Sequence, residues 1–521
     1  MAEGTADDSG LIQVAGHLEQ EPFRMGGSHG GLQGPKYLFR WYKQNCDPGY
    51  DFCGWLEFCS KGEDKFGYRL PGVTTCEIED APVIRMAPGR RYLLILRNLN
   101  EAANGTDSET NIHTHGLHIV GDGNGDDMTR FVQSGNCLKY NWTIGADHMG
   151  GTFWYHPHRH TLTNLQLSGG AFGMMIIEEQ KDLLRELTRR EQRKVSAWLD
   201  NELLLVAFDT GVGGEVLGNG KPQAHFSIVN QEWYRLRVAA VRPRALTRNL
   251  VIHPSGNDCL AHAVAYDGVW RFAVPRFASK FEYPLTGASR IDLAIKCSGA
   301  EAVNITFAGD TVAVLHVEQG QATKATPFAS GNRQWYPARP DYLPDLQTLP
   351  ASKANKFTIF MEGFRPEPRL FFINNKTWEK DVPIGTFQFN TPQEWKLIQT
   401  EEHPFHLHIY HQQIIRDCGT HHEVGQYYDT VSSSEVGKDC IVRFLTKDFS
   451  GRAVFHCHIL RHSDRGMMNW MNVVGGPEPG NIDVDQVSCS AVAAPCQETG
   501  SHCGWGKECC VGRCRRFKCE A

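Results

Sequence analysis

The segment HCHILRHSDRGMM, at residues 456–468, holds the side chains with the clearest chemical potential in this chain. A thiolate with two imidazoles and a weak axial thioether is the ligand set of a blue copper site. Three of these ligands are offered here, by Cys457, His462 and Met467. Side chains alternate along a strand, so His456 and His458 would point away from the copper that the cysteine holds. The segment therefore predicts two metal centres joined by the backbone of one cysteine.

Three further histidine pairs are available for the second centre. Each has the two-residue spacing that places both rings on one face of a strand. The pairs are HTH at His113 and His115, HPH at His156 and His158, and HLH at His406 and His408. With His456 and His458 they make eight imidazoles, enough for three coppers with two ligands on one and three on each of the others. His403, which precedes HLH in HPFHLH, is the best candidate for the missing imidazole of the blue site.

The four motifs, in this order, resemble those of the multicopper oxidases, the family of laccases, ascorbate oxidase, ferroxidases and bilirubin oxidase. The resemblance covers about residues 36–475. It implies four coppers per chain, with His113 and His406 as ligands of a type 2 copper. It assigns the type 3 pair to His115, His156, His158, His408, His456 and His458. It assigns type 1 to His403, Cys457, His462 and Met467. A single H-x-H pair is more often an ordinary strand pair, but four pairs, one of them interrupted by cysteine, argue strongly against that alternative.

The resemblance also implies a reaction. Four one-electron oxidations of a reduced donor, phenolic or otherwise aromatic, would take place at type 1 copper. The electrons would cross Cys457 to His456 and His458, and O2 would be reduced to water at the three-copper cluster. Asp126 and Asp127 lie shortly after the first pair, where the family often places a carboxylate that passes protons. The catalytic residues predicted are therefore these two acids with the cysteine and its flanking histidines.

Two motifs depart from the familiar laccase pattern and leave the donor open. The first reads HTHGLHIVGDGNGDD without the tryptophan of HWHG, and the third reads HPFHLHIYH where laccases have HPFHLHGH. An alternative within the family is a ferroxidase or cuprous oxidase. The eleven methionines include no methionine-rich insertion, which gives that alternative little support.

Proteins of other classes share parts of this pattern. A copper nitrite reductase pairs type 1 and type 2 sites, but it needs neither histidines on both sides of the cysteine nor eight cluster imidazoles. A simple copper-binding or electron-transfer protein needs only one site. A secreted adhesion protein would keep the fold and use a C-terminal module for attachment to a matrix. Four coppers per chain together with donor-driven oxygen uptake fit only the oxidase.

Short apolar runs such as YLLILRN and RAVFHCHI, punctuated by Gly, Pro and Asn, are typical of an all-β sandwich or barrel. The family resemblance implies three cupredoxin-like Greek-key β-barrel domains. The division predicted is an N-terminal extension at 1–35, barrels at 36–180, 200–325 and 350–475, a charged connector at 181–199 and a disulfide-rich module at 489–521. The ligand motifs fall in the first and third barrels only. The three-copper cluster must therefore lie between these two barrels.

Composition and cysteine content indicate where the protein acts. The net charge of −6, with both signs interspersed, gives no case for a nucleic-acid partner. No apolar run approaches the eighteen residues or so of a membrane span. Without Cys457 sixteen cysteines remain, an even number that suits an oxidising compartment. Four N-glycosylation sequons point the same way, at Asn104, Asn141, Asn304 and Asn375. Secretion is expected, although the first residues lack the apolar core of a signal peptide.

The sixteen cysteines divide by neighbourhood into predicted disulfides. Cys418 would pair with Cys440 and Cys259 with Cys297, while Cys46, Cys53, Cys59 and Cys76 would form two bridges. Cys137 and Cys489 remain and are predicted to join the first barrel to the tail. The last six cysteines are spaced C-x6-C-x5-CC-x3-C-x4-C, which resembles a knottin. Fifteen pairings are possible, and the resemblance implies first to fourth, second to fifth and third to sixth. The basic run RCRRFKC would contact an anionic matrix or only keep the module soluble.

Overall fold

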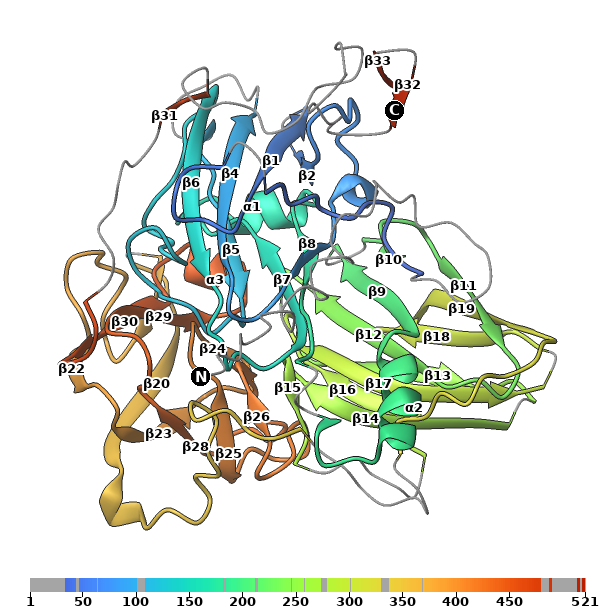
Figure 1. Cartoon of the computed structure of the whole chain (residues 1–521). Coiled ribbons are helices and arrows are strands. Elements are labelled where there is room, and N and C mark those ends of the chain that lie inside the picture. Colours follow the sequence, from blue (N-terminus) through green and yellow to red (C-terminus); the bar gives the residue numbers. More distant parts are fainter. Residues whose placement is uncertain are drawn as a thin grey trace, which may run out of the picture.

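The computed structural model describes residues 33–478 with short gaps, and three short segments beyond them. The gaps lie at 44–45, 63, 101–107, 181–183, 211–213, 245, 257, 273–278, 300, 329–336 and 368, and the later segments are 487–489, 513–515 and 518–520. Within these residues, three pairs of β-sheets follow one another along the chain, from blue and cyan through green and yellow to orange and red in Figure 1. The predicted all-β fold class is confirmed.

The first pair of sheets carries two of the four histidine motifs. One sheet has the strand order β2 (Lys65–Arg69), β1 (Phe52–Lys61), β4 (Arg91–Leu99), β6 (Asn136–Thr143), β31 (Val487–Ser488). The other has the order β3 (Ile84–Met86), β8 (Gly173–Ile177), β7 (Gly151–His156), β5 (His113–His115). Buried side chains from both sheets, including Leu94, Leu138 and Met175, form one apolar core. Because β31 comes from far along the chain, the C-terminal region completes the edge of the first sheet (Figure 1).

The second pair of sheets carries none of the four histidine motifs. Its first sheet has the order β10 (Val216–Gly218), β9 (Glu202–Asp209), β12 (Tyr234–Val241), β17 (Arg290–Ser298), β14 (Asp258–Tyr266), β15 (Val269–Trp270). Its second sheet has the order β11 (Ala224–Val229), β19 (Asp310–Glu318), β18 (Val303–Phe307), β13 (Arg248–His253), β16 (Glu282–Leu285). In β11 the buried Phe226 and Ile228 alternate with the exposed His225 and Ser227. This period of two shows that one face of the strand packs inward.

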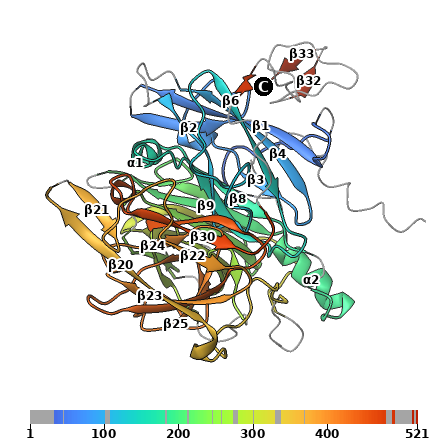
Figure 2. The same ribbon diagram turned by 90° about the vertical axis from the view of Figure 1, so that its left-hand side faces the viewer.

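The third pair of sheets carries the remaining two motifs. One sheet has the order β21 (Leu370–Ile373), β20 (Asn355–Arg365), β23 (Pro392–Ile398), β28 (Cys440–Leu445), β25 (Gln412–Arg416), β26 (Tyr427–Tyr428). The other has the order β22 (Gly385–Gln388), β30 (Met468–Val474), β29 (Gly451–Cys457), β24 (Phe405–Leu407), β27 (Thr430–Val431). Figure 2 shows the first pair above and the third in front of the second. The three pairs thus surround a common centre.

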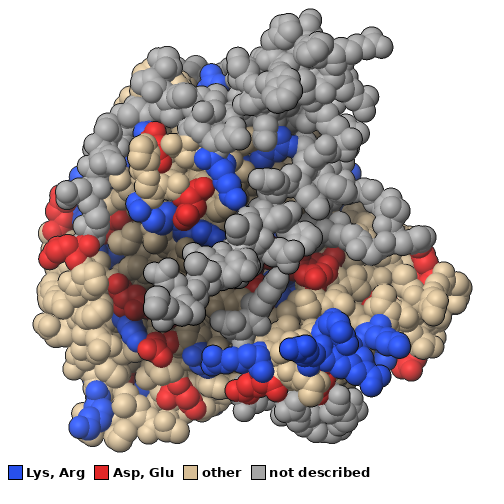
Figure 3. All heavy atoms as spheres, in the orientation of Figure 1, with Lys and Arg blue, Asp and Glu red and all other residues tan. Residues whose placement is uncertain are grey.

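Helices are short and few in the described part of the chain. They are α1 (Thr163–Ser168), α2 (Arg189–Leu199), α3 (Leu460–Ser463) and two 3-10 turns at Ile78–Asp80 and Ala351–Lys353. α2 lies in the predicted connector and is capped by Thr188, whose side chain forms a capping box with Glu191. The helix buries Val195 and Trp198 against the second pair of sheets. Its lysine and arginine side chains therefore gather on the surface over α2, as a basic patch in Figure 3.

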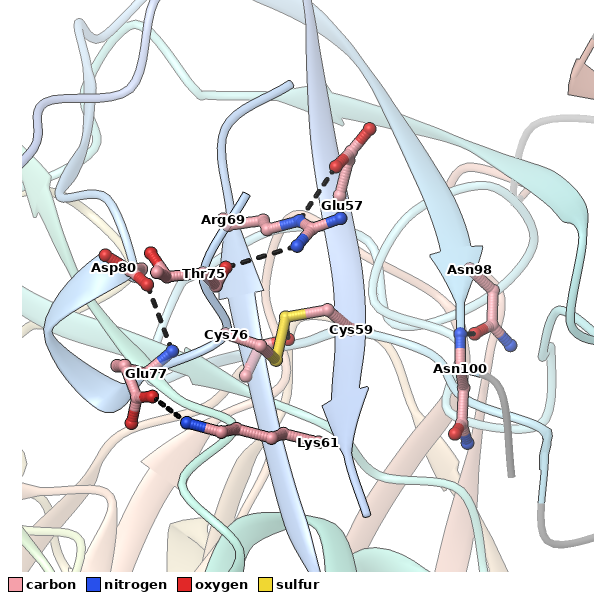
Figure 4. Close-up of a disulfide and its surroundings, with 11 residues drawn as sticks. Glu57, Cys59, Lys61, Arg69, Thr75, Cys76, Glu77, Asp80, Asn98 and Asn100 are labelled. Atoms are coloured by element: carbon pink, nitrogen blue, oxygen red, sulfur yellow. Dashed lines mark hydrogen bonds and ion pairs between the residues drawn. A yellow bond between two sulfur atoms is a disulfide. The ribbon is translucent and has the colours of Figure 1, made fainter. Parts of the chain in front are cut away.

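Five disulfides confirm the predicted pairing. They are Cys46–Cys53, Cys59–Cys76, Cys137–Cys489, Cys259–Cys297 and Cys418–Cys440. Figure 4 shows Cys59–Cys76, which ties β1 to the segment that follows β2, with ion pairs on either side. In these pairs Arg69 contacts Glu57 at 3.0 Å and Lys61 contacts Glu77 at 2.6 Å. Among the cysteines of residues 33–489, Cys457 alone is free, as a copper ligand should be.

The predicted knottin lies mostly outside the described residues. Strands β32 (Arg513–Arg515) and β33 (Lys518–Glu520) pair with each other and place Cys514 opposite Cys519 in register. The other four cysteines of the module fall outside the described segments, so its disulfide pairing stays a prediction. In the part of the chain that the structure describes, no helix has the length and apolar character needed to cross a membrane.

Candidate metal centre

Strand pairing brings the four histidine motifs together in twos. β5 pairs with β7 so that His113 lies opposite His156, and β24 pairs with β29 so that His406 lies opposite His456. The first and third pairs of sheets then face each other across these edges. The rings of His115 and His406 stack with centroids 3.8 Å apart, and those of His113 and His408 lie 3.9 Å apart. The histidines that the sequence divided among four motifs therefore form one cluster.

All eight cluster histidines are buried, and several of their nitrogens have no hydrogen-bond partner. The unpartnered atoms are Nε2 of His113, Nδ1 of His115, Nε2 of His156, Nδ1 of His158, Nε2 of His406, both nitrogens of His408 and both of His458. Burial of a polar atom without a hydrogen-bond partner costs free energy. Nine such nitrogens in one cluster therefore require an explanation. Metal ions supply it, because neutral imidazole nitrogen is a good ligand for copper. The residues present therefore fit a copper cluster.

Three overlapping groups of three histidines each have their ligand atoms within 4.8 Å of one another. They are His113, His406 and His408; His113, His115 and His156; and His158, His408 and His456. Burial lowers the pKa of His156 to about 3, and it holds the pKa of His113 and of His458 well below the ordinary value. These three imidazoles consequently stay neutral at physiological pH. A neutral ring is the form that binds a metal.

A second group of ligands surrounds Cys457, which ends β29. Its Sγ lies 3.8 Å from Nδ1 of His403 and 3.7 Å from Nδ1 of His462. The two ring nitrogens are 3.2 Å apart. Burial lowers the pKa of His403 to about 4 and of His462 to about 3, and it raises the pKa of the Cys457 thiol. A metal that binds here must displace the thiol proton, so metal loading and proton release are linked.

Met467 and Met468 have different surroundings. Met467 is fully buried in the apolar cluster that also contains Cys457, and its carbonyl accepts a hydrogen bond from the cysteine N–H at 3.0 Å. Met468 belongs to a separate cluster with Met128 and Trp470, and its sulfur accepts a bond from a serine hydroxyl. Met467 is therefore the methionine placed beside the Cys457 group.

The two predicted acids have different surroundings. Asp126 accepts hydrogen bonds from Nδ1 of His113 at 2.7 Å and from the backbone N–H of Thr114 at 2.7 Å, and it lies 3.3 Å from Nδ1 of His408. Asp127 instead accepts bonds from Thr129 and lies 3.4 Å from Arg452. The structure thus brings Asp126 to the histidine cluster, and it directs Asp127 toward a neighbouring loop and β29.

Sequence reasoning missed a second acid at the cluster. Asp429, between β26 and β27, lies 3.2 Å from Nε2 of His115, and its carbonyl accepts a bond from Nδ1 of His406 at 3.0 Å. Arg290 of β17 pairs with its carboxylate. The one signal available was an aspartate within the apolar run YYDTV, and nothing in the sequence connected it to a histidine. Arg290 comes from the pair of sheets that has no ligand motif, so no local pattern pointed to it.

Comparison with known proteins agrees with this geometry. Two family models, each described as Multicopper oxidase, match residues 82–182 and 338–476. The chain is 24% identical to a laccase of Bacillus subtilis over 70% of this chain and 80% of the relative. It is 24% identical to laccase-4 of Trametes villosa over 68% and 77%, respectively.

Solved structures resemble this protein over most of its chain. A laccase from Pediococcus acidilactici superposes with a TM-score of 0.64 at 20% identity, covering 87% of this chain and 95% of that one. A multicopper oxidase from Campylobacter jejuni, described as a metallo-oxidase, gives a TM-score of 0.61 at 20% identity and covers 86% and 96%. These likenesses establish the cupredoxin-like fold. The matched models, the laccase relatives and the histidine–cysteine geometry identify the chain as a multicopper oxidase, a copper-dependent enzyme that oxidises a reduced substrate with O2.

Proposed function

We propose that this multicopper oxidase is laccase-like and oxidises small phenolic or aromatic donors. The observation that carries the proposal is the series of aromatic rings leading from the surface to the Cys457 group. Phe364 is 46% exposed and lies 5.3 Å from Phe371, ring centroid to ring centroid. Phe371 in turn stacks on His462 at 3.9 Å with an interplanar angle of 19°. An aromatic donor that stacks on Phe364 would rest close to a ligand of the electron-accepting copper.

The hairpin of β20 and β21 carries these rings and is fixed to the loop of His462. The backbone N–H of Phe371 donates to the carbonyl of Arg465 at 3.0 Å. Figure 2 shows β20 and β21 extending outward from the third pair of sheets. An exposed phenylalanine on such a hairpin has no core to fill, so its side chain is available to a planar ligand. Aromatic pairs contribute about 0.5–1.5 kcal/mol beyond the area they bury.

The ligand assignment in this proposal follows the unpartnered nitrogens. His113 and His406 each bond through Nδ1, to Asp126 and to the carbonyl of Asp429, which leaves Nε2 of both rings for a type 2 copper. The group of His158, His408 and His456 suits one type 3 copper. His115, His156 and His458 remain for the other. His403, Cys457, His462 and Met467 would hold type 1.

Copper, when bound at these sites, supplies the one-electron chemistry and the binding of O2. The protein chain supplies the path for the electrons and holds the ligands in position. Cys457 is continuous through the backbone with His456 and His458, so four electrons accepted one at a time have a short covalent route to the cluster. Asp126 orients His113 and is placed to hold a proton beside it. Four electrons and four protons convert one O2 into two waters.

Phe364→Ala should lower kcat/KM for a simple phenol by about 3- to 10-fold, since one stacking partner is lost. Oxidation of hexacyanoferrate(II), which cannot stack, should be unchanged. Phe360→Ala is the matched control, because Phe360 is 37% exposed on the same strand but four residues earlier. Steady-state oxygen uptake measures all three proteins. Equal losses for both donors, or no loss for the phenol, would refute an aromatic docking site. A donor panel that includes Fe(II) and Cu(I) tests the metallo-oxidase alternative in the same assay.

Secretion is part of the proposal. Five disulfides suit an oxidising compartment, and the sequon asparagines Asn304 and Asn375 are exposed. Residues 490–521 contain none of the proposed copper ligands, so we assign any attachment to an anionic matrix to this tail.

Truncation just after Cys489 should therefore leave four coppers per chain and the rate of oxygen reduction nearly intact. The Cys137–Cys489 bridge is retained, and the six cysteines of the module leave together. Retention on a column of an acidic polysaccharide should be lost, and metal analysis with oxygen uptake supplies the control. A folded truncated protein that turns over donor far more slowly would instead place the tail at the donor site.

A further inference from the structure

A buried arginine of the second pair of sheets reaches the histidine cluster. Arg290, the first residue of β17, is 1% exposed. Its guanidinium contacts both carboxylate oxygens of Asp429, with Nη1 at 3.0 Å from Oδ1 and Nη2 beside Oδ2. Such a two-pronged pair fixes orientation as well as charge. Here it joins the second pair of sheets to the third through two residues that are 139 positions apart.

Asp429 orients two histidines that come from different sheets. Nε2 of His115 donates to its carboxylate at 3.2 Å, and Nδ1 of His406 donates to its backbone carbonyl at 3.0 Å. The nitrogens left over, Nδ1 of His115 and Nε2 of His406, are both buried and unpartnered. Asp429, together with the Thr430 hydroxyl that lies 3.2 Å from Nδ1 of His406 and 3.5 Å from Nε2 of His115, thus determines which nitrogen of each ring is presented to a metal.

Arg290 is itself held on several sides. Its backbone N–H donates to Oδ1 of Asp267 at 2.8 Å, while Oδ2 of Asp267 accepts from the backbone N–H of Asp429 at 3.1 Å. Nη1 also donates to the carbonyl of Ala288 at 2.9 Å, and Nε to the carbonyl of Thr152 at 3.3 Å. The guanidinium is therefore placed before any ligand binds.

Gly116, the glycine of HTHG, leaves room for this pair. It has a φ of +89°, and a Cβ there would lie 2.5 Å from Oδ2 of Asp429 and would overlap Nη2 of Arg290. Any larger residue would push the two side chains apart. The glycine after the first histidine motif is thus explained by an arginine about 170 residues later.

We propose that Arg290 is a positioning residue for the three-copper cluster, through which the second pair of sheets sets the orientation of His115 and His406. The inference rests on the proposed ligand assignment. Removal of the arginine would leave a buried carboxylate without its cation, which is strongly destabilising locally. Asp429 would then move, and the two rings that it orients would lose their fixed tautomers. The Cys457 group shares none of these contacts.

Arg290→Lys tests this role, since lysine keeps the charge but cannot bond both oxygens at once. Loss of such a supporting contact typically weakens metal binding by about 10- to 100-fold. After dialysis against a graded chelator, the variant should release its three cluster coppers at 10- to 100-fold lower chelator concentration than the unmodified protein. The blue absorption per chain should stay unchanged. Metal analysis and the absorption spectrum provide the two measurements.

Arg235→Lys is the matched control, because Arg235 is equally buried and pairs with Asp292 at 2.6 Å in the same sheet. It should keep all four coppers. Four coppers in Arg290→Lys, or parallel loss of cluster copper and blue absorption in both variants, would overturn the proposal. Fewer than four coppers in the unmodified protein would instead overturn the proposed function.

Gly116→Ala disturbs the contact between Arg290 and Asp429 without changing either side chain. It tests the positioning role if Arg290→Lys does not fold. Gly135→Ala controls for backbone strain, since Gly135 has a φ of +81° and a Cβ there would meet no atom within 4 Å. Cluster copper should be lost more easily from Gly116→Ala and held normally by Gly135→Ala. Equal copper retention in the two alanine variants would refute the positioning role.

Discussion

Replacement of Cys457 by serine is expected to abolish the intense blue absorption and the oxidation of every donor. A hydroxyl cannot supply the sulfur–copper bond that gives a type 1 site its colour and its fast electron transfer. Serine is close to cysteine in size, and the position is fully buried, so the fold should persist. The cluster histidines are untouched, and three coppers should remain bound. Absorption spectroscopy with metal analysis measures both outcomes.

Met468→Leu is the control for this substitution. Met468 lies next to the proposed axial ligand but belongs to a different apolar cluster, so the variant should keep four coppers and full colour. A Cys457→Ser protein that folds but loses all four coppers would contradict the division into two independent centres. It would mean that the cluster depends on the type 1 site for its assembly.

The second large effect is expected from the Cys137–Cys489 bridge. Replacing both residues by serine should lower the free energy of unfolding by about 5 kcal/mol, because the bridge closes a loop between residues 352 apart. Strand β31, which precedes Cys489, should also leave the edge of the first sheet. Chemical denaturation followed by circular dichroism measures the loss.

The bridge Cys46–Cys53 offers a matched comparison within the same pair of sheets. Its cysteines are only 7 residues apart, and its removal should cost about 2–3 kcal/mol. Copper content should stay at four in both double variants, since neither bridge contacts a cluster histidine. Equal losses of stability from the long and the short bridge would argue that chain entropy is not the main contribution.

The histidine motifs could be predicted because their spacing is visible in the sequence itself. Strand alternation places His113 and His115 on one face of β5, but in the other three pairs the second histidine lies just after its strand ends, at His156, Leu407 and Cys457. The disulfides could also be predicted, because each cysteine can pair only with one of the few other cysteines in the chain. The extended edge of the first sheet was not predicted, because the two residues of β31 carry no strand signal of their own.

The contacts that orient the cluster histidines could not be predicted from the sequence. Asp127 and Asp126 are adjacent and chemically identical, yet only Asp126 turns to the histidines. Arg290 and Asp429 meet through tertiary packing of sheets that share no motif. The hydrophobic face of α2 was also concealed, since its apolar residues are few among many charges. Local patterns thus identify ligands, while the contacts that orient them depend on the assembled fold.

The division of ligands between the first and third pairs of sheets has a consequence for biosynthesis. His113 leaves the ribosome well before His458, by roughly 20–70 s at about 5–20 residues per second. During that interval the chain offers only the four histidines of the first pair of sheets, and two of the three histidine groups still lack a ligand from the third pair. Those groups are complete only when the third pair of sheets docks, and the Cys137–Cys489 bridge can close only after Cys489 has been made. We therefore expect the full set of coppers to be loaded after the first and third pairs of sheets have met.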